Sequence, residues 1–442
     1  MKPVILVPGI LASRLMRVNR KTGEQVQVWF PIANMSTYDD VIQYLWGRYD
    51  KNLQEYVSFQ DSEWQILPVP GLAGIAHLSN QFPLSLLMGG YEPTIKYLES
   101  LGYTRNVNIF AFPYDWRQDP TGTYTQVLFQ AFVHNIASRT GQKVVLVGHS
   151  MGSVVIKAFI QQKPTVADEF VDKFISVGGA FNGCASNFIN LHREFNVPGF
   201  PSNQALRGLM GSMPSVYSSF PHWPAKYLTR VWIKRTEGKA NEEITMQIPT
   251  ECKCRWKSSQ IIVDELIRKQ IKTPQPIINE LQTKKATKVL HIKQIQKFQH
   301  IDDKSMVKDE VYEFFTPNGN NFLKTAYSGF MQQLVEFDPE IYNAINERMK
   351  KPITSKVKMY SIISIGVPTP KDLIFDTPSC LENLQYQSPR TNFCDGDGFV
   401  QVEAAQDDGF SNSERTFVKG VPHGGMLQNG KVLQIVEQIL KK

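Results

Sequence analysis

Short apolar runs recur along the chain, and they alternate with segments whose apolar residues repeat at helical spacing. The short runs predict strands, and they lie at residues 3–8, 107–112, 143–147, 174–177 and 357–365. The segments with helical spacing predict helices, and they lie at residues 93–101, 123–139, 153–160 and 432–440. Strands that alternate with helices form a mainly parallel sheet with right-handed crossovers, so the sequence predicts an α/β fold.

The alternation is first interrupted by an excursion at residues 12–90, which follows the first strand directly. The excursion contains Trp29, Trp46 and Trp64, which we expect at the surface, and the apolar segment 82–88. Such side chains suit contact with a membrane, although Trp and apolar residues are more often part of a core. The excursion is therefore a candidate membrane-contact segment.

A second interruption, at residues 181–355, is long and mixed in composition, and we interpret it as a cap inserted into the core. It separates a first core part, residues 1–180, from a last core part, residues 356–442. The formal net charge of the chain is +7, and residues 251–300 alone contain eleven Lys and Arg against four Asp and Glu. This segment is either a solvated face or a site that attracts anionic lipid. No recognised nucleic-acid motif accompanies the lysines, so nucleic acid is not expected as a partner.

Length and composition narrow the class of protein. The chain has 442 residues and 42% of them are hydrophobic, so it is able to bury a large core. No apolar run approaches the ~18 residues that a transmembrane helix needs. The N-terminal apolar run is too short for a signal-peptide core and lacks a small-residue cleavage site. We therefore expect a cytoplasmic or peripheral membrane protein, or a lysosomal or secreted one if a signal precedes the given sequence.

The five cysteines form an odd and sparse set, which favours free thiols. Cys380 and Cys394 are close enough in sequence to pair across a loop, which is the alternative. Cys252 and Cys254 lack a second pair of ligands for zinc. The sequence therefore predicts no metal and no cofactor.

Residues 148–152 read Gly-His-Ser-Met-Gly, and they stand between the strand at 143–147 and the helical segment at 153–160. Gly-x-Ser-x-Gly between a strand and a helix is the nucleophile elbow of α/β-hydrolases. Small residues flank the serine because a Cβ there would clash with neighbouring backbone. The motif predicts Ser150 as a nucleophile and an α/β-hydrolase fold with a large inserted cap.

A serine hydroxyl needs a histidine base and a carboxylate, and in this fold the chain order is Ser, acid, His. Of the eight histidines, only His423 lies beyond the predicted core strands, and it lies in a glycine-rich loop. The acid is expected within residues 394–398, Cys-Asp-Gly-Asp-Gly, where Asp395 and Asp397 are both candidates. A calcium loop would need more carboxylates at fixed spacing.

An oxyanion hole needs two backbone N–H donors. One is expected from Met151, directly after the nucleophile. The other is expected from the loop after the first strand, where Ile10 is our choice. His149 is interpreted as a packing residue of the elbow and not as the base.

These motifs together resemble the lecithin:cholesterol acyltransferase family. The opening strand and oxyanion loop at 4–11 match that family, and so do its signatures Gly-Tyr-Thr-Arg at 102–105 and Pro-Tyr-Asp-Trp-Arg at 113–117. The Gly-x-Pro-Thr-Pro turn at 366–370 and the Asp-Gly-Asp-Gly acid loop at 395–398 complete the pattern. In the family the second Asp of this loop belongs to the triad, so the resemblance implies Asp397.

Three features depart from the family pattern. Phe399 stands where the family usually has Thr, and no cysteine precedes Cys184, so the disulfide-closed lid of secreted members is missing. The basic segment 251–300 has no clear family counterpart.

The resemblance implies an acyltransferase or phospholipase A that acts on glycerophospholipids at a membrane or lipoprotein-like surface. Ser150 would form an acyl-Ser intermediate, and water or a lipid alcohol such as a sterol or diacylglycerol would accept the acyl group. The alternatives are a neutral-lipid or small-ester hydrolase of the same fold and, from another class, a non-catalytic lipid-binding protein.

Overall fold

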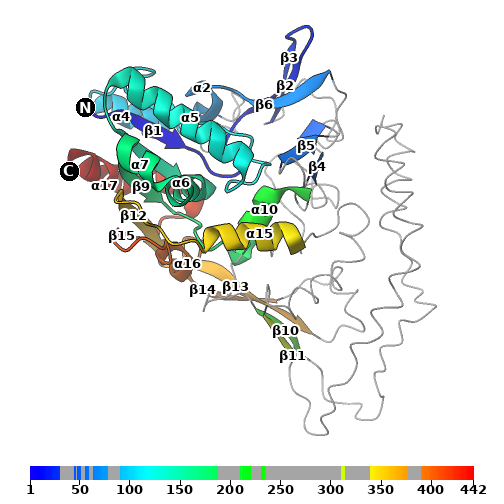
Figure 1. Cartoon of the computed structure of the whole chain (residues 1–442). Helices are drawn as coiled ribbons and strands as arrows, with labels where there is room; N and C mark the ends of the chain where they lie inside the picture. Colours follow the sequence, from blue (N-terminus) through cyan, green and yellow to red (C-terminus); the bar gives the residue numbers. More distant parts are fainter. Residues whose placement is uncertain are drawn as a thin grey trace, which may run out of the picture. The chain divides into compact units, whose positions relative to one another are not determined.

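The computed structural model divides into two compact units, and each is described by itself (Figure 1). The described residues are 1–29, 44–45, 47–50, 55–58, 63–77, 90–187, 210, 212–220, 230–234, 310–313, 339–376 and 390–442. The first unit comprises Met1–Leu228, Asp338–Lys371 and Phe393–Lys442, and the second comprises Thr229–Phe337 and Asp372–Asn392. Trp46, the apolar segment 82–88 and the basic segment 251–300 lie outside the described residues.

The first unit is built on a six-stranded sheet in the order β15-β12-β9-β8-β1-β7, in which all neighbours are parallel. The strands are β1 (Val4–Val7), β7 (Ile109–Ala111), β8 (Val144–His149), β9 (Val171–Val177), β12 (Lys358–Ile365) and β15 (Glu414–Lys419). The predicted α/β fold with a parallel sheet is confirmed. The edge strand β15 is additional to the prediction, because only Val418 of its side chains is buried and it shows no apolar run.

The predicted helices are confirmed with small shifts of their ends. They are α4 (Glu92–Ser100), α5 (Thr123–Thr140), α6 (Met151–Gln162) and α17 (Gly430–Lys441). Helix α5 ends at Gly141, whose φ of 65° is the left-handed conformation that glycine readily adopts. The described part of the first unit contains five further α-helices: α2 (Ala73–Ala76), α7 (Pro164–Phe170), α10 (Pro214–Ser218), α15 (Pro339–Met349) and α16 (Val402–Gln406).

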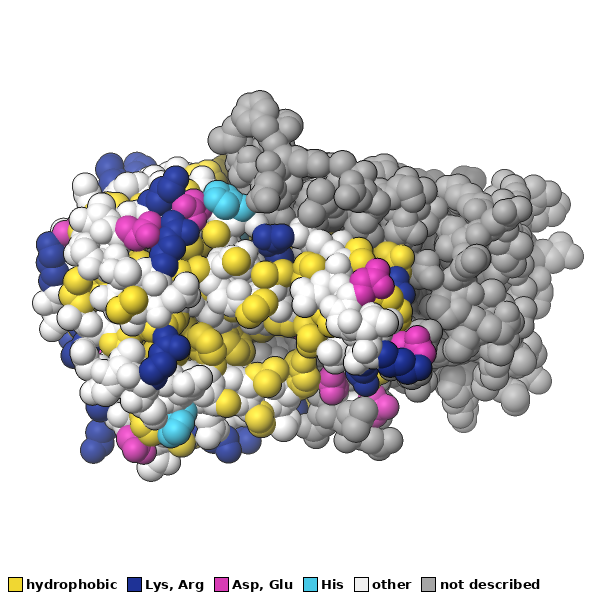
Figure 2. Space-filling model, turned by 90° about the horizontal axis from the view of Figure 1, so that it is seen from above, with side chains coloured by type: hydrophobic (Ala, Val, Ile, Leu, Met, Phe, Trp, Pro, Cys, Tyr) yellow, Lys and Arg dark blue, Asp and Glu magenta, His cyan; other side chains and the backbone are white. Residues whose placement is uncertain are grey.

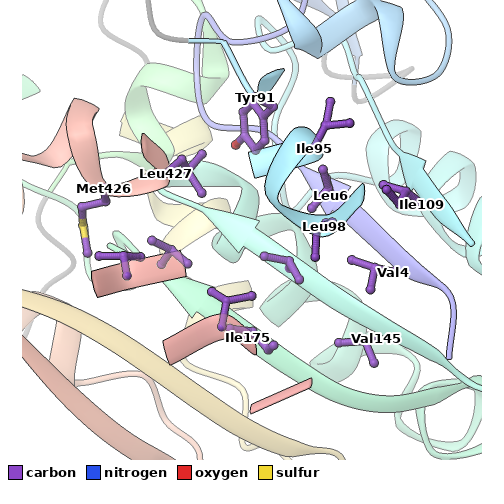
Figure 3. Close-up of a cluster of buried hydrophobic side chains, with 14 of the residues drawn as sticks. Val4, Leu6, Tyr91, Ile95, Leu98, Ile109, Val145, Ile175, Met426 and Leu427 are labelled. Atoms are coloured by element: carbon purple, nitrogen blue, oxygen red, sulfur yellow. The ribbon is translucent and has the colours of Figure 1, made fainter. Parts of the chain in front are cut away.

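One face of the parallel sheet is covered by an apolar cluster that α4 and α17 complete (Figure 3). Alternate side chains of β1, Val4 and Leu6, point into this cluster, as the period of two in a strand requires. Met426 and Leu427 also belong to it, and both are buried. They lie on the short 3₁₀ helix η2 (His423–Gln428), so the core fixes the turn on which His423 is placed.

The excursion after β1 folds into small antiparallel sheets. Strands β2 (Leu15–Asn19), β3 (Gln25–Trp29) and β6 (Trp64–Pro68) form one sheet, and β4 (Gly47–Asp50) pairs with β5 (Glu55–Ser58). The expectation that the tryptophans lie at the surface is wrong for Trp29, which is 1% exposed, because its indole bonds the loop after β1. Trp64 is half-buried.

A second sheet has the order β11-β10-β13-β14. Its strands are β10 (Arg230–Lys234), β11 (Glu310–Glu313), β13 (Val367–Asp376) and β14 (Arg390–Gly396). Strand β10 is antiparallel to β11 and parallel to the end of β13. Strands β10 and β11 lie within the predicted cap at 181–355, whereas α10 and α15, which also lie within it, belong to the first unit.

On the face drawn in Figure 2, apolar side chains gather along the middle of the described surface, while Lys and Arg lie mainly toward its margin. Exposed large hydrophobic side chains of the described residues include Val127 and Leu128 of α5 and Phe417 of β15. No helix in the described part of the chain is long and apolar enough to span a bilayer.

Helix α6 buries a lysine behind the nucleophile elbow. Lys157 is 3% exposed, and its Nζ lies 5.6 Å from the ring centroid of Phe181. Burial lowers the pKa of Lys157 to about 8, and the negative charges of Asp408 and Asp407 oppose this shift only in part.

We expect Lys157→Met to stabilise the protein at pH 7 by roughly 3 kcal/mol, since burial lowers the pKa from 10.5 to about 8 and each pKa unit corresponds to about 1.4 kcal/mol. Between pH 8 and 10.5 the unfolded state binds more protons at this site than the native state, so wild-type stability rises with pH. The difference in unfolding free energy between the variant and the wild type is therefore largest below pH 8 and shrinks toward pH 10.5. Denaturant unfolding at pH 7 and pH 10 measures this difference, and an equal difference at both pH values would contradict the argument.

Candidate active site

The nucleophile elbow has the strained geometry that its sequence predicts. Ser150 has φ 54° and ψ −125° between strand β8 and helix α6, a conformation that non-glycine residues rarely adopt. A Cβ on Gly152 would lie 2.2 Å from the carbonyl oxygen of Val7, and one on Gly148 would lie 2.8 Å from the backbone of Ser153. Both flanking positions therefore require glycine, because the neighbouring backbone atoms leave no room.

The structure brings the predicted triad residues together. His423 Nε2 lies 2.9 Å from Ser150 Oγ, and His423 Nδ1 lies 2.7 Å from Asp397 Oδ2. The backbone N–H of His423 also donates to the carbonyl oxygen of Asp397 at 2.8 Å. This is the spacing of a nucleophile, a base and an orienting carboxylate. The catalytic roles of the three residues remain predictions.

The acid loop turns Asp397 toward His423 and gives its carboxylate several donors. The other oxygen, Oδ1, accepts hydrogen bonds from the backbone N–H groups of Phe399 at 2.9 Å and Val400 at 2.6 Å. Burial favours the neutral acid, but His423 and these two N–H groups outweigh it and hold the pKa of Asp397 below its usual value. The carboxylate is thus kept ionised beside the imidazole.

The second acid candidate, Asp395, lies in the same loop but bonds elsewhere. Its Oδ1 accepts from the backbone N–H of Gly366 at 2.5 Å. Nearby, Thr369 Oγ1 accepts from the backbone N–H of Gly398 at 2.8 Å. The Gly-x-Pro-Thr-Pro motif at 366–370 therefore holds the acid loop, which gives it a structural role, although its residues 367–370 form the start of strand β13 and not the expected turn.

Gly178, directly after β9, provides the space in which the acid and the base meet. A Cβ at this residue would lie 3.3 Å from His423 Nδ1 and 3.4 Å from Asp397 Oδ2. Its φ of 58° is also the left-handed conformation that favours glycine.

Two further rings lie against the imidazole of His423. The ring centroid of Phe399 is 5.2 Å away with a stacked geometry, and that of His149 is 4.9 Å away. His149 Nε2 lies 3.2 Å from the carbonyl oxygen of His423. Burial, followed by the charge of His423, lowers the pKa of His149 to about 3, so His149 stays neutral. His149 thus packs in the elbow as predicted, while the contact of Phe399 with His423 has no local signal in the sequence.

The predicted oxyanion donors flank the nucleophile. A Cβ on Gly9 would lie 3.0 Å from Ser150 Cβ, so the loop after β1 runs directly beside the serine. In that loop Ala12 N–H donates to the carbonyl oxygen of Gly9 at 3.2 Å, and such a four-residue turn does not use the N–H of Ile10. Met151 is the first residue of α6, and its N–H lies outside the helical ladder. Both donors remain predictions.

The Pro-Tyr-Asp-Trp-Arg motif lies beside this loop and is buried. Arg117 is 2% exposed and donates to both carboxylate oxygens of Asp115, at 2.8 and 2.7 Å. Arg117 also donates to the carbonyl oxygen of Leu45 at 3.2 Å. Gln118, directly after the motif, donates to the carbonyl oxygen of Tyr56 and accepts from its N–H, so this residue fastens the β4–β5 strand pair to the core. Elsewhere, the thiol of Cys184 is free and buried, whereas Cys380, the candidate partner of Cys394, lies outside the described residues.

The parallel sheet, the elbow and the Ser–His–Asp geometry define an α/β-hydrolase. Residues 53–407 match the lecithin:cholesterol acyltransferase family. The chain belongs to this family.

Among its relatives, lecithin-cholesterol acyltransferase-like 4 of Arabidopsis thaliana is 23% identical over 100% of this chain and 75% of its own length. Phospholipase A(1) LCAT3 of the same plant is 21% identical over 99% of this chain and 90% of its own length. The lysosomal phospholipase A and acyltransferase of Mus musculus is 29% identical over 41% of this chain and 48% of its own length.

Proposed function

We propose that the protein is a serine phospholipase A and acyltransferase that acts on glycerophospholipids. The observation that carries the proposal is the hydrogen-bonded series from Ser150 through His423 to Asp397 in a chain of this family. Relatives named as a phospholipase A(1) and as a phospholipase A and acyltransferase support the substrate class and both reactions.

In the proposed mechanism Ser150 Oγ attacks the acyl carbonyl of the phospholipid while His423 Nε2 takes the hydroxyl proton. Asp397 holds the proton of His423 on Nδ1 and stabilises the imidazolium that forms. The N–H groups of Ile10 and Met151 bind the oxyanion. The lysophospholipid leaves with the proton from His423, and water or a lipid alcohol then attacks the acyl-Ser150 ester.

A fluorophosphonate probe separates this function from the non-catalytic alternative. We expect covalent labelling at Ser150, detected by mass spectrometry, and no labelling of Ser150→Ala. An unlabelled wild-type protein that still binds lipid vesicles would favour a lipid-binding protein. Turnover of neutral lipids or small esters without turnover of phospholipid would favour the alternative hydrolase.

We expect dual behaviour toward phospholipid vesicles. Without an acceptor the products should be free fatty acid and lysophospholipid. When a sterol or diacylglycerol is added to the membrane, part of the acyl groups should be diverted, because an alcohol held near the acyl carbon gains effective molarity over water. The measurement is the ratio of free fatty acid to acylated alcohol as the alcohol fraction rises. A ratio that never falls, with total turnover unchanged, would mark a strict phospholipase.

Work at a membrane surface is part of this proposal, and the basic segment 251–300 supports it. Each basic contact with anionic lipid contributes about 1 kcal/mol and weakens with salt. Vesicle sedimentation at low salt tests this, and equal binding to zwitterionic and anionic vesicles would leave the segment as a solvated face.

A further inference from the structure

The loop that carries the proposed oxyanion donor contains a strained residue. Leu11 has φ 63°, although it is neither Gly nor Asn. The bond from Ala12 N–H to the carbonyl oxygen of Gly9 makes Leu11 the third residue of a four-residue turn, where a positive φ normally selects Gly or Asn. Such strain persists only where the surroundings enforce it, and it concentrates at functional sites.

The surroundings that hold Leu11 come from the antiparallel sheet of the excursion. Trp29, the last residue of β3, donates from Nε1 to the carbonyl oxygen of Leu11 at 2.8 Å. Trp29 is buried, and Trp116 packs edge-on against it with ring centroids 5.1 Å apart. Trp116 in turn donates from Nε1 to the carbonyl oxygen of Ser13 at 3.1 Å.

A third aromatic side chain holds the other end of the turn. Tyr114 Oη donates to the carbonyl oxygen of Pro8 at 3.0 Å, and its ring is buried. Buried aromatic side chains therefore donate hydrogen bonds to carbonyl oxygens before, within and after the turn. Of these three bonds, the one from Trp29 is made to the strained residue itself.

The bond from Trp29 continues through two peptide groups toward the site. The C=O of Leu11 and the N–H of Ala12 belong to one planar peptide, and the C=O of Gly9 and the N–H of Ile10 belong to another. Trp29 bonds the first peptide, and the first peptide bonds the second through Ala12 and Gly9. Orienting the first peptide thus orients the N–H of Ile10, and hydrogen bonds in series polarise one another.

We propose that Trp29 is a positioning residue of the oxyanion hole, which it aligns through the peptides of Leu11 and Gly9. The inference rests on the proposed function, because it assumes that Ile10 N–H binds the oxyanion. It assigns to the excursion at 12–90 a part in the chemical step that is separate from any contact with lipid.

The test uses Trp29→Phe, which removes the indole N–H and keeps an aromatic ring. Trp64→Phe is the matched control, because Trp64 lies in the same three-stranded sheet and its ring stacks on Arg17. Each protein is assayed on p-nitrophenyl butyrate and on its thiono analogue, in which sulfur replaces the carbonyl oxygen. Sulfur accepts hydrogen bonds weakly, so the ratio of the two rates reports on the oxyanion hole and not on the amount of folded enzyme.

We expect Trp29→Phe to lower kcat for the oxygen ester by about 10-fold with little change in KM, as loosening one donor should lose less than removing it. The ratio of oxygen-ester to thiono-ester rates should fall by a similar factor, and Trp64→Phe should leave the ratio unchanged. If Trp29→Phe does not fold, 3-benzothienylalanine at position 29 exchanges only the N–H for sulfur and keeps the shape of the ring.

A ratio equal to that of the wild type in a folded protein without this N–H would overturn the inference while leaving the proposed function intact. An equal fall of the ratio in Trp64→Phe would also overturn it, because the effect would then belong to the sheet as a whole. A wild-type protein that turns over neither ester and is not labelled at Ser150 would overturn the proposed function itself.

Discussion

Ser150→Ala, His423→Ala and Asp397→Asn are each expected to lower kcat by at least about 10³-fold, and double variants should lose little more. The reason is that the three side chains form one hydrogen-bonded series, so removing any member disables proton transfer from the serine. Initial rates on phospholipid vesicles measure the effect, and unchanged vesicle binding would show that the loss lies in the chemical step.

Asp395→Asn is the matched control for the acid. Asp395 accepts a hydrogen bond from Gly366 N–H, and the amide oxygen of Asn is able to accept the same bond. Its activity should therefore stay near that of the wild type. If Asp395→Asn were inactive and Asp397→Asn active, Asp395 would be the acid.

Arg117→Met is expected to lower the free energy of unfolding by about 3–5 kcal/mol, because it leaves the carboxylate of Asp115 buried without its cation. The double variant Asp115→Leu, Arg117→Met should recover most of this loss, since no unpaired charge remains. Denaturant unfolding with constant m-values measures the difference.

Arg105→Met provides the comparison for that buried pair. Arg105 bonds Glu92 and Glu99, but its side chain is 36% exposed, so its loss should lower stability by less than about 1 kcal/mol. A single Arg117→Met variant no less stable than the double variant would contradict the argument that the carboxylate of Asp115 is costly to bury without its cation.

Much of the central sheet was predictable because buried parallel strands read as continuous apolar runs. Strands β1, β8 and β12 and helices α4, α5 and α17 follow directly from periodicity. Strand β15 could not be found in this way, since it lies at the sheet edge and buries only Val418. Strand β9 begins at Val171, three residues before the predicted run, because Asp172 and Lys173 interrupt its apolar pattern.

The residues of the candidate site differ in how far the neighbouring sequence predicts their place in the site. Ser150 stands in a motif whose glycines have a steric reason, and His423 followed from chain order. The choice of Asp397 over Asp395 needed the family resemblance. Trp29 was expected at the surface and is buried, because its partner is the carbonyl of Leu11, a contact that no local pattern encodes. The positive φ of Leu11 was equally hidden, since leucine rarely adopts it.

The proposed site is divided along the chain in a way that matters for biosynthesis. Ser150 and the oxyanion loop belong to the first part of the chain, whereas Asp397 and His423 follow β12. A nascent chain therefore carries its nucleophile long before it carries a base. On the proposed mechanism, we therefore expect it to gain lipid-deacylating activity only after translation has passed His423 and β12 has paired with β9. For the same reason, we expect chains that end early within residues 181–355 to be inactive, so that incomplete synthesis releases no active lipase.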